Sequence, residues 1–322
     1  MSELRFLPPM RMHPAYRHGD MTPWGGEQLK TVFGKDIPDE RTGEALEMSV
    51  IPGLESTGDN GETLTALIER YGSRLTGLPE GTEFPLLLKL LAAKGSLSVQ
   101  VHPDDEYAKV HENKLGKTEA WVILHAEEGA SLLYGIREGV TIDDLRRALT
   151  GGEDVEPLIQ RVPVKAGDVF YMPAGMVHAI GGGILLYEIQ QSSDVTYRLW
   201  DFNRVNAKGE KRPLHIQQSL DVIRPELKGQ RAHMPEHPAQ EITHLLDVPA
   251  FTLDCVAADG ACILPAADTF RVLTALEPLT LRWLEGEMEL KAGDTVLLPA
   301  ACPEIGLEGH GRALVSGVGS KA

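Results

Sequence analysis

The sequence predicts a mainly β protein built from two related barrels or sandwiches. Most apolar runs are short and are separated by Gly, Pro and Asp turns, as is typical of short strands in such folds. Helical spacing of apolar residues is confined to short stretches near residues 62–76, 141–150 and 214–224. A third observation is that a segment near the C-terminus repeats one in the first half of the chain.

The predicted strands form two groups. In the first half, strand candidates lie at residues 84–91, 96–102, 119–126, 130–136, 161–175 and 183–191. After residue 240 the chain consists almost entirely of short strand candidates. The polar segment 228–240, which contains two prolines, is the best linker candidate between the groups. We therefore expect a first domain over residues 1–235 and a second barrel over residues 236–322.

The repeat pairs "VKAGDVFYMPAGMVHAIG", which starts at Val164, with "LKAGDTVLLPAACPEIGL", which starts at Leu290. The tetrapeptide Lys-Ala-Gly-Asp, a later proline and the apolar alternation are common to both copies. Duplication of a β unit explains this match. His178 of the first copy corresponds to Glu304 of the second, so a site built on this histidine should exist only in the first unit.

The composition excludes several classes of function. The chain has 322 residues, 42% of them hydrophobic, and a formal net charge of −16. This acidity argues against nucleic acids and anionic membrane surfaces as partners. The most apolar run contains lysines and does not predict a membrane span, and the N-terminus has no secretory signal pattern. The cysteines have no zinc-motif spacing, so we expect reduced thiols in a cytoplasmic protein, at Cys255, Cys262 and Cys302.

A candidate site begins in the stretch "SVQVHPDDEYAKVHENKLGKTEAW", residues 98–121. Alternate residues of a strand project to the same side, so Gln100 and His102 should share a polar face while the valines between them pack the other way. Glu119 opens a later predicted strand. If that strand lies beside the first, its carboxylate can reach the same pocket.

A second motif follows in "GDVFYMPAGMVHAIG", where Gly167, Pro173, Gly175 and His178 have a fixed spacing. This spacing resembles the second conserved motif of the cupin superfamily, small double-sheet β-barrels that hold a metal ion. The resemblance implies a chain of two cupin-like jelly-roll barrels with a small helical insertion. The second barrel, which lacks the histidine, is expected to be metal-free.

The first cupin motif would then be filled by Gln100, His102 and Glu119, which with His178 give four nitrogen and oxygen donors. Each residue alone would be expected to play a structural part, but four of them on adjacent barrel strands are hard to explain by chance. Such a set suits Zn²⁺ and also Co²⁺, Mn²⁺ or Fe²⁺.

Longer motifs, in the same order and spread over nearly the whole chain, resemble type I mannose-6-phosphate isomerases of the short bacterial form. They include "QVHPDD", "GKTEAW" and "EIQQSSDVTYRLWD". The resemblance implies an intramolecular oxidoreductase of carbohydrate metabolism that interconverts mannose 6-phosphate and fructose 6-phosphate through an enediol. It implies one zinc ion per chain, held by Gln100, His102, Glu119 and His178.

The same resemblance implies that Arg198 is the active-site arginine and that Lys117, Glu188, Lys89 and Ser98 line the substrate pocket. Without it, Arg198 would be interpreted as a surface ion-pair partner and Lys117 as a loop lysine. Glu188 or a histidine could act as the general base. We expect Arg198 near the reacting carbons and Lys89 or Lys117 at the phosphate.

Two other functions compete with this interpretation. One is a metal-dependent cupin dioxygenase, which would use similar ligands around redox-active iron. The other is a non-catalytic cupin that binds a sugar phosphate, although a sensor would not need the full set of Lys117, Glu188 and Arg198. In each case the partner is a small molecule. The protein itself is expected to be a monomer or homodimer.

Overall fold

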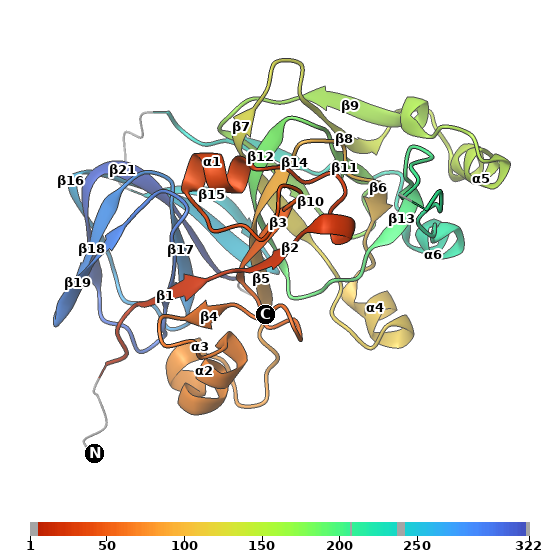
Figure 1. Ribbon diagram of the computed structural model, residues 1–322. Coiled ribbons are helices and arrows are strands. Elements are labelled where there is room, and N and C mark those ends of the chain that lie inside the picture. Colours follow the sequence, from red (N-terminus) through yellow and green to blue (C-terminus); the bar gives the residue numbers. More distant parts are fainter. Residues whose placement is uncertain (1–5, 207, 237–241, 320–322) are drawn as a thin grey trace.

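The computed structural model describes residues 6–206, 208–236 and 242–319 (Figure 1). It is mainly β, as predicted, with three sheets whose paired strands are all antiparallel and a small number of short helices. No helix within these ranges has the length and apolar character that crossing a membrane requires. The helices are α1 (Gln28–Phe33), α2 (Leu64–Tyr71), α3 (Ser73–Thr76), α4 (Asp105–His111), α5 (Ile142–Gly151) and α6 (Ile216–Val222), with 3₁₀ turns η1 (Gly19–Met21) and η2 (Glu156–Leu158).

Two of the sheets face each other and form the first unit. The seven-stranded sheet has the order β14-β10-β7-β12-β5-β3-β2, and the five-stranded sheet has the order β13-β6-β11-β8-β9. The first contains β2 (Ala15–Arg17), β3 (Glu44–Met48), β5 (Leu86–Ala93), β7 (Glu119–Ala126), β10 (Asp168–Met172), β12 (Ile184–Gln191) and β14 (Gln230–His233). The second contains β6 (Val99–Val101), β8 (Ser131–Ile136), β9 (Ile159–Pro163), β11 (His178–Ile180) and β13 (Tyr197–Trp200).

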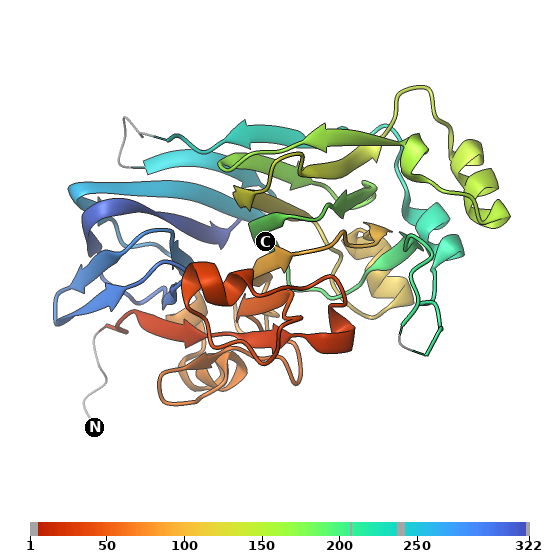
Figure 2. The ribbon, with the colours of Figure 1, turned by 45° about the horizontal axis from the view of Figure 1, so that its top comes forward.

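The third sheet forms the second unit and also contains strands from the N-terminal part of the chain. Its members are β1 (Met10–His13), β4 (Thr57–Gly58), β15 (Ile242–Val248), β16 (Phe251–Leu264), β17 (Arg271–Ala275), β18 (Leu279–Trp283), β19 (Gly286–Leu290), β20 (Thr295–Leu298) and β21 (Ile305–Val318). Met10 pairs with Leu297, so the red N-terminal strand lies beside the blue C-terminal strands in Figure 2. A division of the chain at residue 235 stays a proposal, and β1 would cross it.

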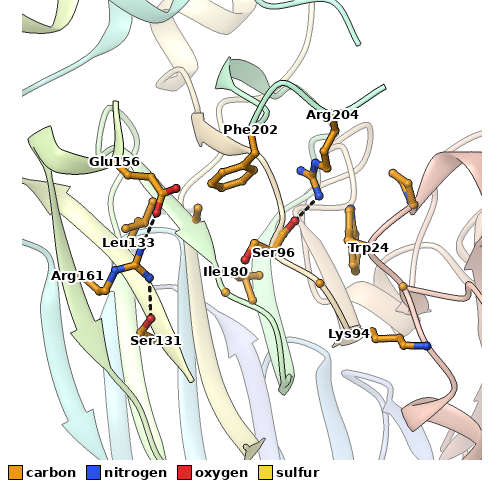
Figure 3. A pocket seen from close by; sticks show the side chains of 15 residues that line it. Trp24, Lys94, Ser96, Ser131, Leu133, Glu156, Arg161, Ile180, Phe202 and Arg204 are labelled. Carbon is orange, nitrogen blue, oxygen red and sulfur yellow. Dashed lines mark hydrogen bonds and ion pairs between the residues drawn. The ribbon is translucent and has the colours of Figure 1, made fainter. Parts of the chain in front are cut away.

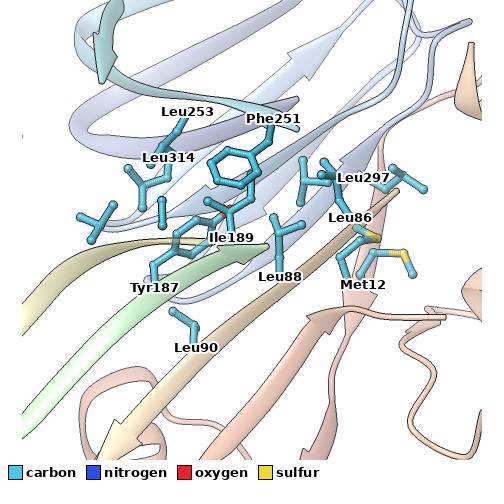
Figure 4. Packing of buried hydrophobic residues seen from close by; sticks show 14 of the residues in the cluster. Met12, Leu86, Leu88, Leu90, Tyr187, Ile189, Phe251, Leu253, Leu297 and Leu314 are labelled. Carbon is cyan, nitrogen blue, oxygen red and sulfur yellow. The ribbon is translucent and has the colours of Figure 1, made fainter. Parts of the chain in front are cut away.

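The seven-stranded sheet is buried on both faces. Trp121 and Leu186 point into the first unit, where they pack against residues of the five-stranded sheet such as Ile180. Tyr187 and Ile189 point the other way. They pack against the second unit, where Figure 4 shows Phe251, Leu253 and Leu314. Burial on two sides explains why β5 is apolar on both faces apart from Lys89.

Helices cover the outer face of the five-stranded sheet and lie where helical spacing was predicted. Leu145 and Leu149 of α5 and Leu220 of α6 share a buried cluster with Val99 of β6. Thr141 caps α5 through a capping box with Asp144. Part of the predicted linker instead forms β14, which pairs with β10, and residues 237–241 lie outside the described part of the chain.

The sequence repeat produces the same local structure twice. The backbone N–H of Lys165 donates to the Asp168 carboxylate at 2.9 Å, and that of Lys291 donates to Asp294 at 2.9 Å. The glycine before each aspartate has a positive φ, +90° and +84°, which few other residues adopt without strain. Each turn leads directly into a strand, β10 or β20. Glu304, the counterpart of His178, is exposed.

The two units also share a buried hydrogen bond, at 2.7 Å between the Tyr187 hydroxyl and Ser316 Oγ. We expect Tyr187→Phe and Ser316→Ala each to lower the free energy of unfolding by about 1 kcal/mol, because each leaves a buried hydroxyl or its partner unsatisfied. The double variant should lose no more free energy of unfolding than the less stable of the two single variants. Urea denaturation of the four proteins measures this, and fully additive losses would contradict it.

Candidate metal centre and active-site cavity

Two histidines and a glutamate meet at a buried point between the two sheets of the first unit. His102 follows β6, Glu119 begins β7 and His178 begins β11. One ligand atom of each lies within 4.8 Å of the others, and each residue is 1% exposed. Glu119 thus comes from the seven-stranded sheet and the histidines from the five-stranded sheet, so packing of the two sheets creates the cluster.

Backbone hydrogen bonds orient both imidazole rings. Nδ1 of His102 lies 2.9 Å from the carbonyl oxygen of Val195, and Nδ1 of His178 lies 2.9 Å from that of Met176. A ring that donates through Nδ1 leaves Nε2 available to a metal ion, the usual arrangement of metal-bound histidine. Both Nε2 atoms face the Glu119 carboxylate, at 3.0 Å for His178 and 3.5 Å for His102.

The cluster leaves polar atoms unsatisfied. Despite the short distances, neither Glu119 oxygen nor His178 Nε2 has a correctly oriented hydrogen-bond partner among the described residues, although Glu119 Oε2 forms an ion pair with Lys117. Such buried groups cost about 1–3 kcal/mol each when unpaired. A divalent cation would satisfy them, and nitrogen and oxygen atoms are suitable donors for several such ions. The group could therefore hold a metal ion.

The electrostatics favour the ligand forms of these side chains. Burial, together with the nearby Lys117 charge, lowers the pKa of His102 to about 3, so the ring is neutral. Burial alone would raise the pKa of Glu119, but Lys117 and the two histidines hold it well below its usual range. Gln100 lies directly opposite His178 in the pairing of β6 with β11.

Lys117 lies against this cluster. Its Nζ is 2.9 Å from Glu119 Oε2 and 3.0 Å from His102 Nε2, and the residue is 5% exposed. Burial disfavours the ammonium, but Glu119 and Glu188 outweigh this effect and raise the pKa of Lys117. The lysine therefore stays charged beside the acceptor atoms that a metal ion would use.

A row of alternating charges continues from Lys117 across the seven-stranded sheet. Glu188 Oε1 lies 3.9 Å from Lys117 Nζ and 3.2 Å from Lys89 Nζ, and Lys89 lies 3.9 Å from Glu44. Glu188 and Lys89 are direct neighbours in the β12–β5 ladder. Burial raises the pKa of Glu188 despite the two lysines, whereas Lys89 and Arg17 lower that of Glu44 against the effect of burial.

Arg198 lies on the other wall. It faces Gln100 across the β13–β6 pair, and its Nε is 3.4 Å from Ser98 Oγ. The side chain is half-buried, and burial together with the positive charge of Arg212 lowers its pKa. Arg212 is itself held by the buried carboxylate of Asp201 at 2.7 Å.

These residues open onto one cavity of about 390 Å³. Its wall contains the predicted residues Lys89, Ser98, Gln100, Lys117, Glu188 and Arg198. His102, Glu119 and His178 lie behind Lys117, which touches the first two. The structure thus brings all the predicted site residues into one region.

Sequence reasoning missed several polar or aromatic residues of this wall, among them Arg17, Trp24, Glu44 and Arg212. A signal existed for Glu44, because it belongs to β3, a strand whose residues are all buried. A carboxylate in such a strand needs a buried partner. The position of Arg17 carried no comparable signal, since it depends on the pairing of β2 with β3.

A second cavity, of about 520 Å³, adjoins the first and shares Trp24 and Ile180 with it (Figure 3). Its two arginines already have partners. Arg161 pairs with Glu156, and Arg204 donates to the backbone oxygen of Ser96. The described lining of this cavity contains none of the predicted site residues.

Comparison with known proteins identifies the family. The model of the type I phosphomannose isomerase catalytic domain matches residues 11–128. Mannose-6-phosphate isomerase from Streptococcus mutans is 48% identical over 203 residues, 62% of this chain and 64% of that protein. Mannose-6-phosphate isomerase ManA from Bacillus subtilis is 40% identical over 302 residues, 91% of this chain and 94% of that protein. The chain belongs to the mannose-6-phosphate isomerase family.

Solved structures agree with this membership. The crystal structure of the Bacillus subtilis mannose 6-phosphate isomerase has a TM-score of 0.89 at 32% identity, and the match covers 97% of this chain and 100% of that one. The apo enzyme from Salmonella typhimurium has a TM-score of 0.76 at 16% identity, over 97% of this chain and 100% of that one. At that identity the second match supports the fold alone.

The cluster makes a prediction about metal content. We expect His178→Ala to lose most bound metal, because changing a residue that only orients a ligand typically costs about 10–100-fold in affinity and a lost ligand should cost more. Glu304→Ala, at the equivalent position of the second repeat, should keep the wild-type content. Elemental analysis of the purified proteins measures this, and equal metal in both variants would refute the ligand assignment.

Proposed function

We propose that this protein interconverts mannose 6-phosphate and fructose 6-phosphate through an enediol, with one zinc ion per chain held by Gln100, His102, Glu119 and His178. The observation that carries the proposal is the buried His102–Glu119–His178 cluster behind a cavity of opposite charges. The names of the related proteins support the substrate and the reaction. Zinc is supported by the donor set, which contains no sulfur and two imidazoles.

The reaction moves a proton between C1 and C2 of the sugar. A divalent ion, when bound, supplies a Lewis acid that polarises the substrate oxygens. Glu188 is our candidate for the general base. Its burial and raised pKa bring it closer to neutral pH than a free glutamate, which suits proton transfer in both directions. Lys89 and Lys117 on either side compensate its charge.

The geometry also supports separate roles for the cations. Lys117 contacts two of the proposed metal ligands, so we place it beside the sugar oxygens at the metal. This leaves Lys89, together with Ser98, for the phosphate. Arg198 is placed near the reacting carbons, where its guanidinium can donate two hydrogen bonds to the oxygens of the enediolate.

We further propose a cytoplasmic protein that is a monomer or homodimer. The three cysteines are buried thiols, as expected for a reducing compartment. The acidic net charge and the polar cavity are consistent with a small phosphorylated sugar as partner rather than nucleic acid or membrane.

A coupled assay tests the proposed reaction. Metal-replete protein should convert mannose 6-phosphate to fructose 6-phosphate, lose turnover in a chelator and regain it when Zn²⁺ is added. Metal-replete protein without turnover would refute the proposal. Oxygen consumption with iron would then indicate a dioxygenase, and substrate binding without turnover a sensor.

Glu188 makes a separate prediction about pH. The carboxylate must be ionised to accept a proton, so kcat should fall as the pH drops through its pKa, at a higher pH than for an ordinary glutamate. Glu188→Gln should lower kcat by about 10²-fold or more, since general base catalysis is worth about 10²–10⁴-fold. Glu304→Gln is the matched control. Near-normal turnover in Glu188→Gln would assign the proton transfer to another group.

A further inference from the structure

Arg198 occupies an exposed edge of the five-stranded sheet. Its strand, β13, is the outermost strand of that sheet and pairs only with β6 there, and Figure 1 shows it next to α6. An edge strand presents backbone N–H and C=O groups that have no strand partner. The β13–β6 register also shifts between Arg198 and Trp200, and such bulges change the direction of nearby side chains.

His215 supplies hydrogen-bond partners for the backbone of Arg198 on the side that has no neighbouring strand. The backbone N–H of Arg198 donates to His215 Nδ1 at 3.1 Å, and the backbone N–H of His215 donates to the carbonyl oxygen of Arg198 at 2.8 Å. One residue therefore satisfies both outward backbone groups of Arg198, as a neighbouring strand would. The same segment also holds the guanidinium, since Arg198 Nη1 donates to the carbonyl oxygen of Pro213 at 2.9 Å.

The chemistry of the ring fits this contact. Burial, together with the charge of Arg198, lowers the pKa of His215, so the imidazole is neutral at neutral pH and its Nδ1 can accept a hydrogen bond. His215 occupies the N-cap position of α6, where a side chain often accepts from the helix backbone. Its side chain makes no such cap and instead accepts from Arg198.

We propose that His215 is a positioning residue for Arg198, and thereby for the isomerisation proposed above, on which this inference rests. It fixes the backbone of a bulged edge strand at the residue that presents the guanidinium to the cavity. The sequence pattern does not predict a role for His215, because its contact with Arg198 depends on how the chain returns from β13 to α6.

The test compares side chains that place an acceptor at different points. The side-chain oxygen of asparagine lies as many bonds from the backbone as Nδ1 of histidine, whereas that of glutamine lies where Nε2 would be. Relative to wild type, we expect His215→Ala and His215→Gln to lower kcat/KM roughly tenfold through misplacement of Arg198, and His215→Asn to stay within about threefold. Bound metal should be unchanged in all three.

A double-mutant cycle separates positioning from a general structural effect. In an Arg198→Ala background, where kcat/KM is already low, His215→Ala should change it by less than about twofold, because the group it positions is gone. His111→Ala, on α4, is the control histidine. If His215→Ala does not fold, the Asn and Gln variants still distinguish an acceptor at Nδ1 from a space-filling side chain.

Three results would overturn the inference: an unchanged kcat/KM in His215→Ala, equal losses in the Asn and Gln variants, or the same loss from His215→Ala with and without Arg198. A lower melting temperature with normal kcat/KM would show a purely structural role. Wild-type turnover is measured first. Its absence refutes the proposed function, whereas an active wild type with an unaffected His215→Ala refutes only the positioning role.

Discussion

The site depends on a row of buried charges that stabilise one another. Glu44, Lys89, Glu188, Lys117 and Glu119 alternate in sign across the seven-stranded sheet, with successive contacts between 2.9 and 3.9 Å. Removing one partner from such a row leaves an uncompensated buried charge, which typically costs about 3–5 kcal/mol. The row therefore connects the His102–Glu119–His178 cluster at one end to the cavity along its length. The stability of the sheet and the layout of the site are thus coupled.

The two sheets contribute different chemistry. The seven-stranded sheet supplies carboxylates and lysines, and its other face is packed against the second unit. The five-stranded sheet supplies imidazoles, an amide and the arginine, and its outer face is packed against α5, α6 and loop residues such as Val155. The sheet that carries the buried charges is therefore packed on both of its faces. Arg198 lies instead on an edge strand.

Much of the candidate site could be predicted from local sequence patterns. Strand alternation placed Gln100 and His102 on one face, and a motif identified His178, but only the folded sheets show that Glu119 joins them. His178 is surrounded in sequence by the apolar residues Val177, Ala179 and Ile180, so no polar alternation reveals it. Arg17 could not be predicted, because its place depends on pairing between segments whose registers the sequence does not state. The roles of the site residues were predicted from the resemblance to the isomerase family and not from periodicity.

The pairing of β1 with β20 has a consequence for how the chain is made. Met10 emerges from the ribosome well before its partner Leu297, which lies much later in the chain. At about 5–20 residues per second, the first strand waits on the order of tens of seconds for its neighbour. During that time the apolar face of the seven-stranded sheet also lacks its cover. The third sheet can therefore be completed only after β20 has been synthesised.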